Sequence, residues 1–201
     1  VARSAPDGYT LLYGTNGTDG INPALYGNLR FDPVKDFVPV SRLTQIAALL
    51  IVNPALPVRS VAELVAYARA NPGKLTYSSP GHGSMAHLTA ELIQRGTGIK
   101  LTHVPYKGSA PALTEFLGGS VNLAMDLAST YIPHLKSGSV RALAISSAKR
   151  SAAAPAIPTI AENGMPGFDS VTWFGVLAPT GTPPARPLAS GTTSGWMPAC
   201  W

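Results

Sequence analysis

The sequence predicts an α/β protein in which mostly parallel β-sheets are flanked by helices. Over about a hundred residues in the middle of the chain, apolar strand patterns alternate with helical patterns, one pair about every 20 to 30 residues. Hydrophobic residues fill 45% of the 201 positions and charged residues only 12%, about half the usual share. Twenty glycines and 19 prolines are spread along the chain, which indicates many tight connections between elements.

The first part of the chain is less regular than the middle. A β-branched and aromatic run at residues 9–15 predicts a strand after the Pro6-Asp7-Gly8 turn. Residues 16–20 are typical of a polar loop, and residues 31–40 of an extended segment broken by prolines. The continuous apolar run from Ala47 to Val52 is typical of a strand that is buried on both faces.

The regular alternation begins near residue 60. Ser60 and Glu63 form the capping-box pattern of a helix start, and Ser84 and Ser109 are expected to cap two further helices. Strands joined by such helices are expected to run parallel, with right-handed crossovers. The expected helices cover residues 60–70, 84–95, 109–117 and 129–136. The expected strands cover residues 75–79, 101–105, 121–125 and 140–146.

The last part of the chain contains one more strand pattern. Residues 162–168 are expected to form a turn, and the apolar run at residues 171–177 predicts a strand. Beyond Pro187 the sequence has neither a helical nor a strand period, so residues 188–201 are expected to be unstructured.

Polar residues gather where three of the expected parallel strands end. The turn from Ser79 to Ser84 follows the first of them, Tyr106-Lys107-Gly108 the second, and Asp126 the third. Ligands of such sheets bind beyond the carboxyl ends of the strands, so these segments are expected to line one side of a cleft. The turn at 79–84 joins a strand to a helix N-terminus, where backbone N–H groups and the helix dipole favour an anion. It contains no acid, cysteine or lysine, which indicates binding rather than reaction.

A dinucleotide site is the alternative for the same turn. Gly81, Gly83 and Ala86 match the fingerprint G-x-G-x-x-[G/A] between a strand and a helix, which would suit an NAD or FAD enzyme. That fingerprint also requires an acid about 20 residues further on, to bind the ribose hydroxyl. The corresponding segment, residues 101–105, contains none.

Two other kinds of site are less well supported by the pattern. A hydrolase could use Ser84, His87 or His103, and Asp126, but the G-x-S-x-G elbow is missing and helix capping explains the serine. Asp126 could equally cap the helix that follows it. His82 and His87 are five positions apart, which does not place them on one helix face and therefore disfavours a metal pair. Structural roles are expected for His103 and His134.

Charge, cysteine usage and hydropathy argue against several other classes of protein. The net charge is +5, but Lys and Arg never form a run, which disfavours nucleic-acid binding and suits a small acidic ligand. The only cysteine, Cys200, allows neither a disulfide framework nor a Cys-based metal site. No apolar run reaches the roughly 18 residues that a membrane span needs. The start, Val1-Ala2-Arg3-Ser4, has no initiator Met and no signal peptide, so we expect a chain cut at its front.

Several motifs resemble one family, the extracytoplasmic solute receptors of tripartite tricarboxylate transporters, also called Bug-type periplasmic binding proteins. They occur in the family's order over roughly residues 3–184. The matching segments are PDGYTLL at 6–12, TNGTDGINPALY at 15–26, DFVPVSRL at 36–43, KLTYSSPGHGSMAHLTAEL at 74–92, THVPYKGSAPALTEFLGG at 102–119, LKSGSVRALAISSAKR at 135–150, PTIAENGMPGF at 158–168 and WFGVLAPTGTP at 173–183.

The resemblance implies a type II periplasmic-binding-protein-like fold, with two α/β lobes that close on a small carboxylate. Residues 52–171 would form the complete second lobe, and residues 1–51 and 172–187 part of the first. Residues 188–201 would be a non-native tail, so the chain is expected to be truncated at both ends. The positions that would line the cleft are Asn16, Ser79, Gly81, Gly83, Ser84, His87, Tyr106, Lys107, Gly108 and Asp126.

The same resemblance implies a non-enzymatic role in transport. The protein would be a periplasmic monomer whose export signal is not in this chain. It would capture a di- or tricarboxylate or a related organic acid and pass it to the membrane components of the transporter. Neither a cofactor nor a metal is expected.

Overall fold

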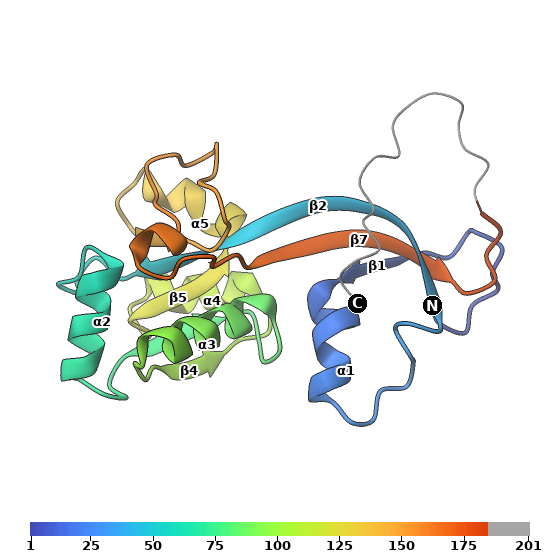
Figure 1. Cartoon of the computed structure of the whole chain (residues 1–201), viewed down its shortest axis with the longest axis horizontal. Coiled ribbons are helices and arrows are strands. Elements are labelled where there is room, and N and C mark those ends of the chain that lie inside the picture. Colours follow the sequence, from blue (N-terminus) through green and yellow to red (C-terminus); the bar gives the residue numbers. More distant parts are fainter. Residues whose placement is uncertain (185–201) are drawn as a thin grey trace. The chain divides into compact units, whose positions relative to one another are not determined.

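The computed structural model describes residues 1–184 and divides the chain into two compact units. Unit 1 contains Val1–Gln45 and the segment from Thr172 onward, and unit 2 contains Ile46–Val171. The chain therefore passes from one unit to the other twice, within the long strand β2 and at the start of β7 (Figure 1). No helix among the described residues is long and apolar enough to cross a bilayer.

Unit 2 contains a five-stranded sheet in the order β6-β2-β5-β3-β4. β3 pairs in parallel with both β4 and β5, whereas β2 is antiparallel to both β5 and β6. Four of the five strands therefore run in the same direction, and the predicted α/β class is confirmed. The strands are β2 (Phe37–Val52), β3 (Thr76–Ser79), β4 (Thr102–Pro105), β5 (Leu123–Leu127) and β6 (Arg141–Ile145).

The position of β2 is the feature of this sheet that the strand–helix alternation does not predict. β2 lies between β5 and β6 and runs against them, so the sheet is mixed. No crossover helix precedes this strand in unit 2, and the rule that makes strands of a βαβ unit parallel does not apply to it. Ala48 to Val52 are buried, as the continuous apolar run predicts.

Four helices cover the sheet of unit 2. The serines expected at two helix starts are confirmed as caps: Ser60 Oγ accepts from Glu63 N at 3.1 Å, and Ser84 Oγ accepts from His87 N at 3.2 Å. The prediction for Ser109 is wrong, because Gly108 occupies the N-cap position without a side-chain bond. The helices are α2 (Val61–Ala70), α3 (Met85–Thr97), α4 (Ser109–Leu117) and α5 (Ala128–Leu135), and a short 3₁₀ turn, η2, covers Ala161–Asn163.

Two apolar clusters fill the space between this sheet and its helices. Leu50 and Val52 pack into the cluster that includes residues of α2 and α3, whereas Leu49 and Ile51 pack into the cluster that includes residues of α4 and α5. The alternation follows from the two-residue period of a strand, which sends neighbouring side chains to opposite faces. Each fully buried Leu or Ile contributes about 1.5–3 kcal/mol of hydrophobic free energy, so β2 is a central source of stability in unit 2.

Unit 1 contains the strand order β1-β7-β2. β1 (Leu12–Thr15) is antiparallel to β7 (Val171–Pro179), and β2 extends back to Phe37. Residues 31–40 were expected to be a proline-broken extended segment, and their last part joins β2 with Pro39 inside the strand.

The segment predicted as a polar loop in unit 1 is helical instead. It forms the wide turn η1 (Asn16–Ile21), which continues into α1 (Asn22–Leu25). Thr15 Oγ1 accepts from Thr18 N at 3.2 Å, and the buried Asp19 accepts from Thr15 N at 3.0 Å. A Cβ on Gly14 would lie 2.3 Å from the Asp19 carboxylate, so this turn requires a glycine there. Residues 188–201, predicted to be unstructured, lie outside the described residues.

Candidate functional site

The loops that follow β3 and β4 lie side by side at one edge of unit 2. Tyr106 N donates to Ser79 O at 3.0 Å, and Gly108 N donates to Pro80 O at 2.9 Å. These bonds extend the parallel pairing of the two strands into the loops beyond them. The carboxyl-end edge expected from the strand order therefore exists, and it brings Ser79, Gly81, Tyr106 and Gly108 together.

Two glycines shape the turn after β3. Gly81 has a φ of 149° and Gly83 a φ of 73°, both in the range that side chains rarely adopt. A Cβ on Gly81 would lie 3.2 Å from the Tyr106 carbonyl oxygen of the neighbouring loop. Glycine therefore lets the two loops approach each other closely.

Most of the donors in this turn already have partners inside it. Gly81 N donates to Ser79 Oγ at 3.2 Å, and Ser84 N donates to Gly81 O at 3.3 Å. Gly83 N donates to His87 Nδ1 at 3.3 Å, and Ser84 Oγ donates to Gly81 O at 2.8 Å. An anion bound at this turn would have to replace a bond, and the long bond between Gly83 and His87 is among the weakest of them.

Asp126 lies near the carboxyl end of β5, the strand that pairs with the other side of β3, and is completely buried. Its Oδ1 accepts from Ser109 Oγ at 2.9 Å and from Leu127 N at 2.7 Å. Its Oδ2 has no hydrogen-bond partner among residues 1–184. Burial raises the pKa of this carboxyl from 3.8 to about 6. Ser109 is the first residue of α4, which follows the loop after β4. The bond from Ser109 to the buried Asp126 therefore fixes the end of that loop.

The remaining predicted residues differ in exposure and in place. Lys107 is exposed at the end of the loop after β4, next to the half-buried Tyr106. Burial raises the pKa of the Tyr106 phenol. Asn16 belongs to unit 1, where it is the first residue of η1.

Three histidines come together beside the same turn, which the spacing argument did not predict. His82 comes from the turn, His87 from the first turn of α3 and His103 from β4. The rings of His87 and His103 stack with centroids 4.2 Å apart, and His82 meets them edge-on at 5.3 and 4.9 Å. One ring nitrogen from each residue lies within 4.8 Å of the others. The prediction compared positions on one helix face, whereas a turn, a helix and a neighbouring strand supply these three side chains.

His103 has an unusual environment within this histidine cluster. Its Nε2 lies 2.7 Å from Ser79 Oγ, and its Nδ1 is buried without a hydrogen-bond partner in the described part of the chain. Burial, and then the neighbouring His87 and His82, lower its pKa from 6.5 to about 4. Its ring also stacks on Tyr77 at 4.8 Å. The imidazole is therefore neutral near pH 7.

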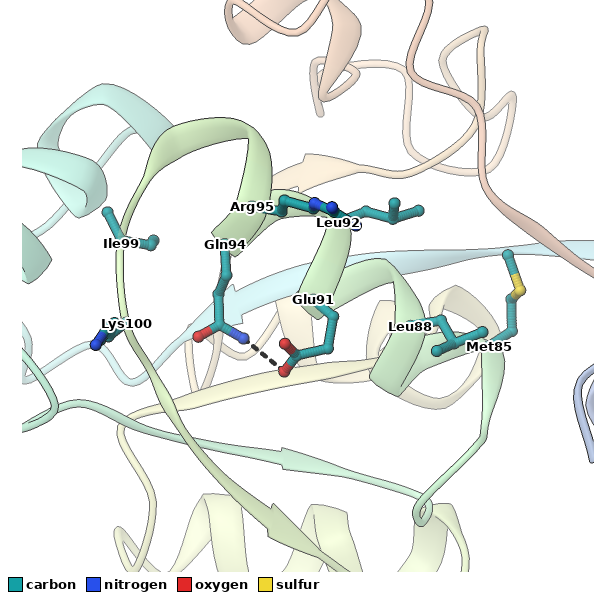
Figure 2. A pocket seen from close by; sticks show the side chains of 8 residues that line it. All are labelled: Met85, Leu88, Glu91, Leu92, Gln94, Arg95, Ile99 and Lys100. Atoms are coloured by element: carbon teal, nitrogen blue, oxygen red, sulfur yellow. Dashed lines mark hydrogen bonds between the residues drawn. The ribbon is translucent and has the colours of Figure 1, made fainter. Parts of the chain in front are cut away.

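A groove along α3 contains none of the predicted site residues. Glu91 and Gln94 lie within it, and Gln94 Nε2 donates to Glu91 Oε1 at 2.7 Å (Figure 2). The same carboxylate oxygen accepts from Tyr77 OH at 2.9 Å and lies 3.9 Å from His87 Nε2. Glu91 therefore connects the groove to the histidine cluster. The lining residues are Met85, Leu88, Glu91, Leu92, Gln94, Arg95, Ile99 and Lys100 (Figure 2).

The geometry also bears on the two enzyme alternatives. Ser84 Oγ is bonded to Gly81 O and His87 N, so it is used as a cap and not as a nucleophile paired with an imidazole. β4 ends at Pro105 without the acid that a dinucleotide fold requires. Neither a hydrolase with Ser84 as its nucleophile nor a dinucleotide arrangement is favoured.

Relatives of known name match most of the chain. Protein BugT of Bordetella pertussis is 40% identical over 184 residues, which are 91% of this chain and 56% of BugT. A protein from the tcbD-tcbE intergenic region of a Pseudomonas strain is 36% identical over 184 residues, covering 91% of this chain and 54% of that protein. The chain thus spans a little over half the length of these relatives.

Solved structures also match the fold of this chain. The structure named "R. palustris Rpa4515 with adipate" is 44% identical, with a TM-score of 0.87 over 91% of this chain and 61% of that chain. MatC of Rhodopseudomonas palustris with bound malate is 36% identical, with a TM-score of 0.82 over 91% and 62%. Periplasmic binding protein BugD is 34% identical, with a TM-score of 0.83 over 91% and 61%.

The family whose description is "Tripartite tricarboxylate transporter family receptor" matches residues 1–199. This match covers almost the whole chain, and it confirms the resemblance carried by the sequence motifs. The periplasmic-binding-protein fold class is confirmed by the solved structures. The chain belongs to the receptor family of tripartite tricarboxylate transporters.

Proposed function

We propose that the chain is part of a periplasmic solute receptor that captures a small organic-acid anion. The observation that carries this proposal is its likeness to two solved receptors whose names include a dicarboxylate, adipate in one and malate in the other. The receptor would pass the anion to the membrane components of a tripartite transporter, act as a monomer and catalyse no reaction. The net charge of +5 would favour the approach of an anionic ligand.

The two lobes of this receptor would be residues 52–171, and residues 1–51 together with 172–187. The second lobe would offer the turn from Ser79 to Ser84, His87 and the loop from Tyr106 to Gly108, and the first lobe would offer Asn16. Lys107 is the exposed cation of this set, and Gly83 N is one of two backbone donors in the turn whose present bonds are 3.3 Å long. Because Asp126 is completely buried, it would act by holding Ser109 and not by contacting the ligand.

Ligand-dependent thermal stability tests this proposal. A bound anion stabilises the folded state by RT ln(1 + [L]/Kd), about 2.7 kcal/mol at one hundred times Kd. Adipate, malate, succinate or citrate is therefore expected to raise the Tm of the 201-residue chain. NAD and FAD are expected to leave it unchanged. A rise with NAD or FAD and none with any carboxylate would overturn the proposal.

A negative charge introduced into the turn tests where the anion binds. Gly83→Asp places a carboxylate where the ligand is expected and should abolish the Tm rise. Gly73→Asp controls for the backbone strain alone, because Gly73 has a φ of 71°, close to the 73° of Gly83, but is exposed whereas Gly83 is buried. Carboxylate binding that survives Gly83→Asp would place the site elsewhere.

A further inference from the structure

The histidine cluster of unit 2 consists of His82, His87 and His103, and the receptor function does not use it as a whole. We propose that these three side chains bind one divalent transition-metal ion of the class that prefers imidazole ligands, for which Zn²⁺ is the probe. All three belong to unit 2, so the site needs no residue from elsewhere. The proposal does not depend on whether the chain binds a carboxylate.

The spacing of the ring nitrogens is the first support. One nitrogen from each ring lies within 4.8 Å of the others. In a tetrahedral zinc site with Zn–N bonds of about 2.0–2.1 Å, ligand nitrogens lie about 3.3 Å apart. The nitrogens therefore have to approach each other by about 1.5 Å or less, and the stacked rings of His87 and His103 have to turn until their in-plane lone pairs converge. His82 is exposed on the turn, so a change of its side-chain rotamer can supply much of that movement.

The polar neighbours of the cluster are those that metal-binding histidines usually have. Ser79 Oγ lies 2.7 Å from His103 Nε2, which leaves the buried Nδ1 of that ring without a partner among the described residues. An unpaired buried nitrogen is unfavourable, and a metal ion would satisfy it. Glu91 Oε1 lies 3.9 Å from His87 Nε2 and is itself held by Tyr77 OH. A carboxylate beside Nε2 orients an imidazole that binds a metal through its other nitrogen, Nδ1.

The bond between Gly83 N and His87 Nδ1 defines what metal binding would change. With Nε2 facing Glu91, His87 would bind through Nδ1 and give up its 3.3 Å bond to Gly83. This loss should leave the fold of unit 2 intact, because neither Gly83 nor His87 belongs to either apolar cluster.

The chemistry of the donor set selects the kind of metal. Three imidazoles suit Zn²⁺, Co²⁺, Ni²⁺ or Cu²⁺, whereas Mg²⁺ and Ca²⁺ prefer carboxylate and carbonyl oxygens. Three protein ligands leave a fourth position on the ion for water or an anion. If the three rings only pack against one another and Tyr77, the protein will bind the transition-metal ions no more tightly than Mg²⁺ or Ca²⁺.

Calorimetric titration of the 201-residue chain tests the site. The protein carries no polyhistidine tag, is stripped with EDTA and is titrated with ZnCl₂ and separately with MgCl₂. One Zn²⁺ per chain is expected to bind, and Mg²⁺ is expected not to bind. His82→Gln should weaken Zn²⁺ binding roughly tenfold or more by removing one of three ligands. His134→Gln is the matched control, since it removes the one histidine outside the cluster, and should leave the affinity unchanged.

A spectroscopic readout separates this site from loose surface binding. Co²⁺ added to the stripped protein should give the visible absorption of a nitrogen-ligated, four-coordinate ion, and His82→Gln should remove it. Because His82 is exposed, this variant should keep its circular dichroism spectrum and its Tm in EDTA. Zn²⁺ affinity equal in His82→Gln and in the parent, or binding of Mg²⁺ as tight as that of Zn²⁺, would overturn the proposal.

Discussion

At the scale of single residues, Asp126 combines complete burial with one carboxylate oxygen that lacks a partner among residues 1–184. Burial favours the neutral carboxyl and raises its pKa from 3.8 to about 6. The hydrogen bonds from Leu127 N and Ser109 Oγ act in the opposite direction but do not cancel the effect. The charged form therefore reduces the stability of the folded chain.

This burial gives stability a pH dependence of defined sign. Between pH 3.8 and about 6, Asp126 is ionised in the unfolded chain but still protonated in the folded one. The folded state binds more protons there, so the contribution of this group is complete at low pH and is lost as pH rises to about 6. The loss amounts to about 3 kcal/mol at most.

Asp126→Asn is expected to remove this loss. Relative to the parent, the variant should become more stable as pH rises from 4 to 7, by up to about 3 kcal/mol. Urea unfolding at several pH values measures the difference. Asp169→Asn, which removes an exposed carboxylate of the same unit, is the control and should follow the parent. A constant difference between Asp126→Asn and the parent across this range would contradict the prediction.

At the scale of elements, helix starts show where local sequence is sufficient and where it is not. Ser60 and Ser84 cap their helices because the capping bond involves only residues three positions apart. Ser109 has the same local pattern, but its hydroxyl donates to Asp126, which is 17 positions away on a neighbouring strand. A long-range partner that is buried and charged competes successfully with a local cap.

Removing a serine that caps a helix should therefore lower the free energy of unfolding more than removing an exposed serine without a capping bond. Ser60→Ala is expected to lower the free energy of unfolding by about 1 kcal/mol, because Glu63 N loses its acceptor. Ser129→Ala, at an exposed position of α5 without a capping bond, should change it by less than about 0.5 kcal/mol. Chemical denaturation of both variants checks this. Equal effects would contradict the capping role of Ser60.

At the scale of the whole molecule, both large apolar clusters found among the described residues lie in unit 2. β5 lies between β2 and β3, and Ala124 and Met125 in it are buried. β1 is an edge strand of unit 1 that pairs with β7, and Tyr13 in it is 60% exposed. The two units therefore differ in how well their strands are protected from water.

Amide hydrogen exchange should reveal this difference. We expect the amide hydrogens of Ala124 and Met125 to exchange at least about tenfold more slowly than that of Tyr13, because core strands open only with their whole unit. Nuclear magnetic resonance, corrected for intrinsic exchange rates, measures both. Equal protection of β1 and β5 would show that the two units unfold as one.

The sequence by itself determined the kind and order of most elements, two of the three predicted caps and the family. These features depend on periodicity and on contacts a few residues apart, and the family motifs are written in the chain directly. Only the tertiary structure decided that β2 inserts antiparallel, that residues 16–20 are helical and that the donors of the 79–84 turn are largely satisfied. It also decided that His82, His87 and His103 meet. The place of β2 and the meeting of the three histidines depend on segments distant in sequence, which local patterns do not specify. The two turns are held by side-chain bonds between residues two to four positions apart, which hydrophobic periodicity does not reveal.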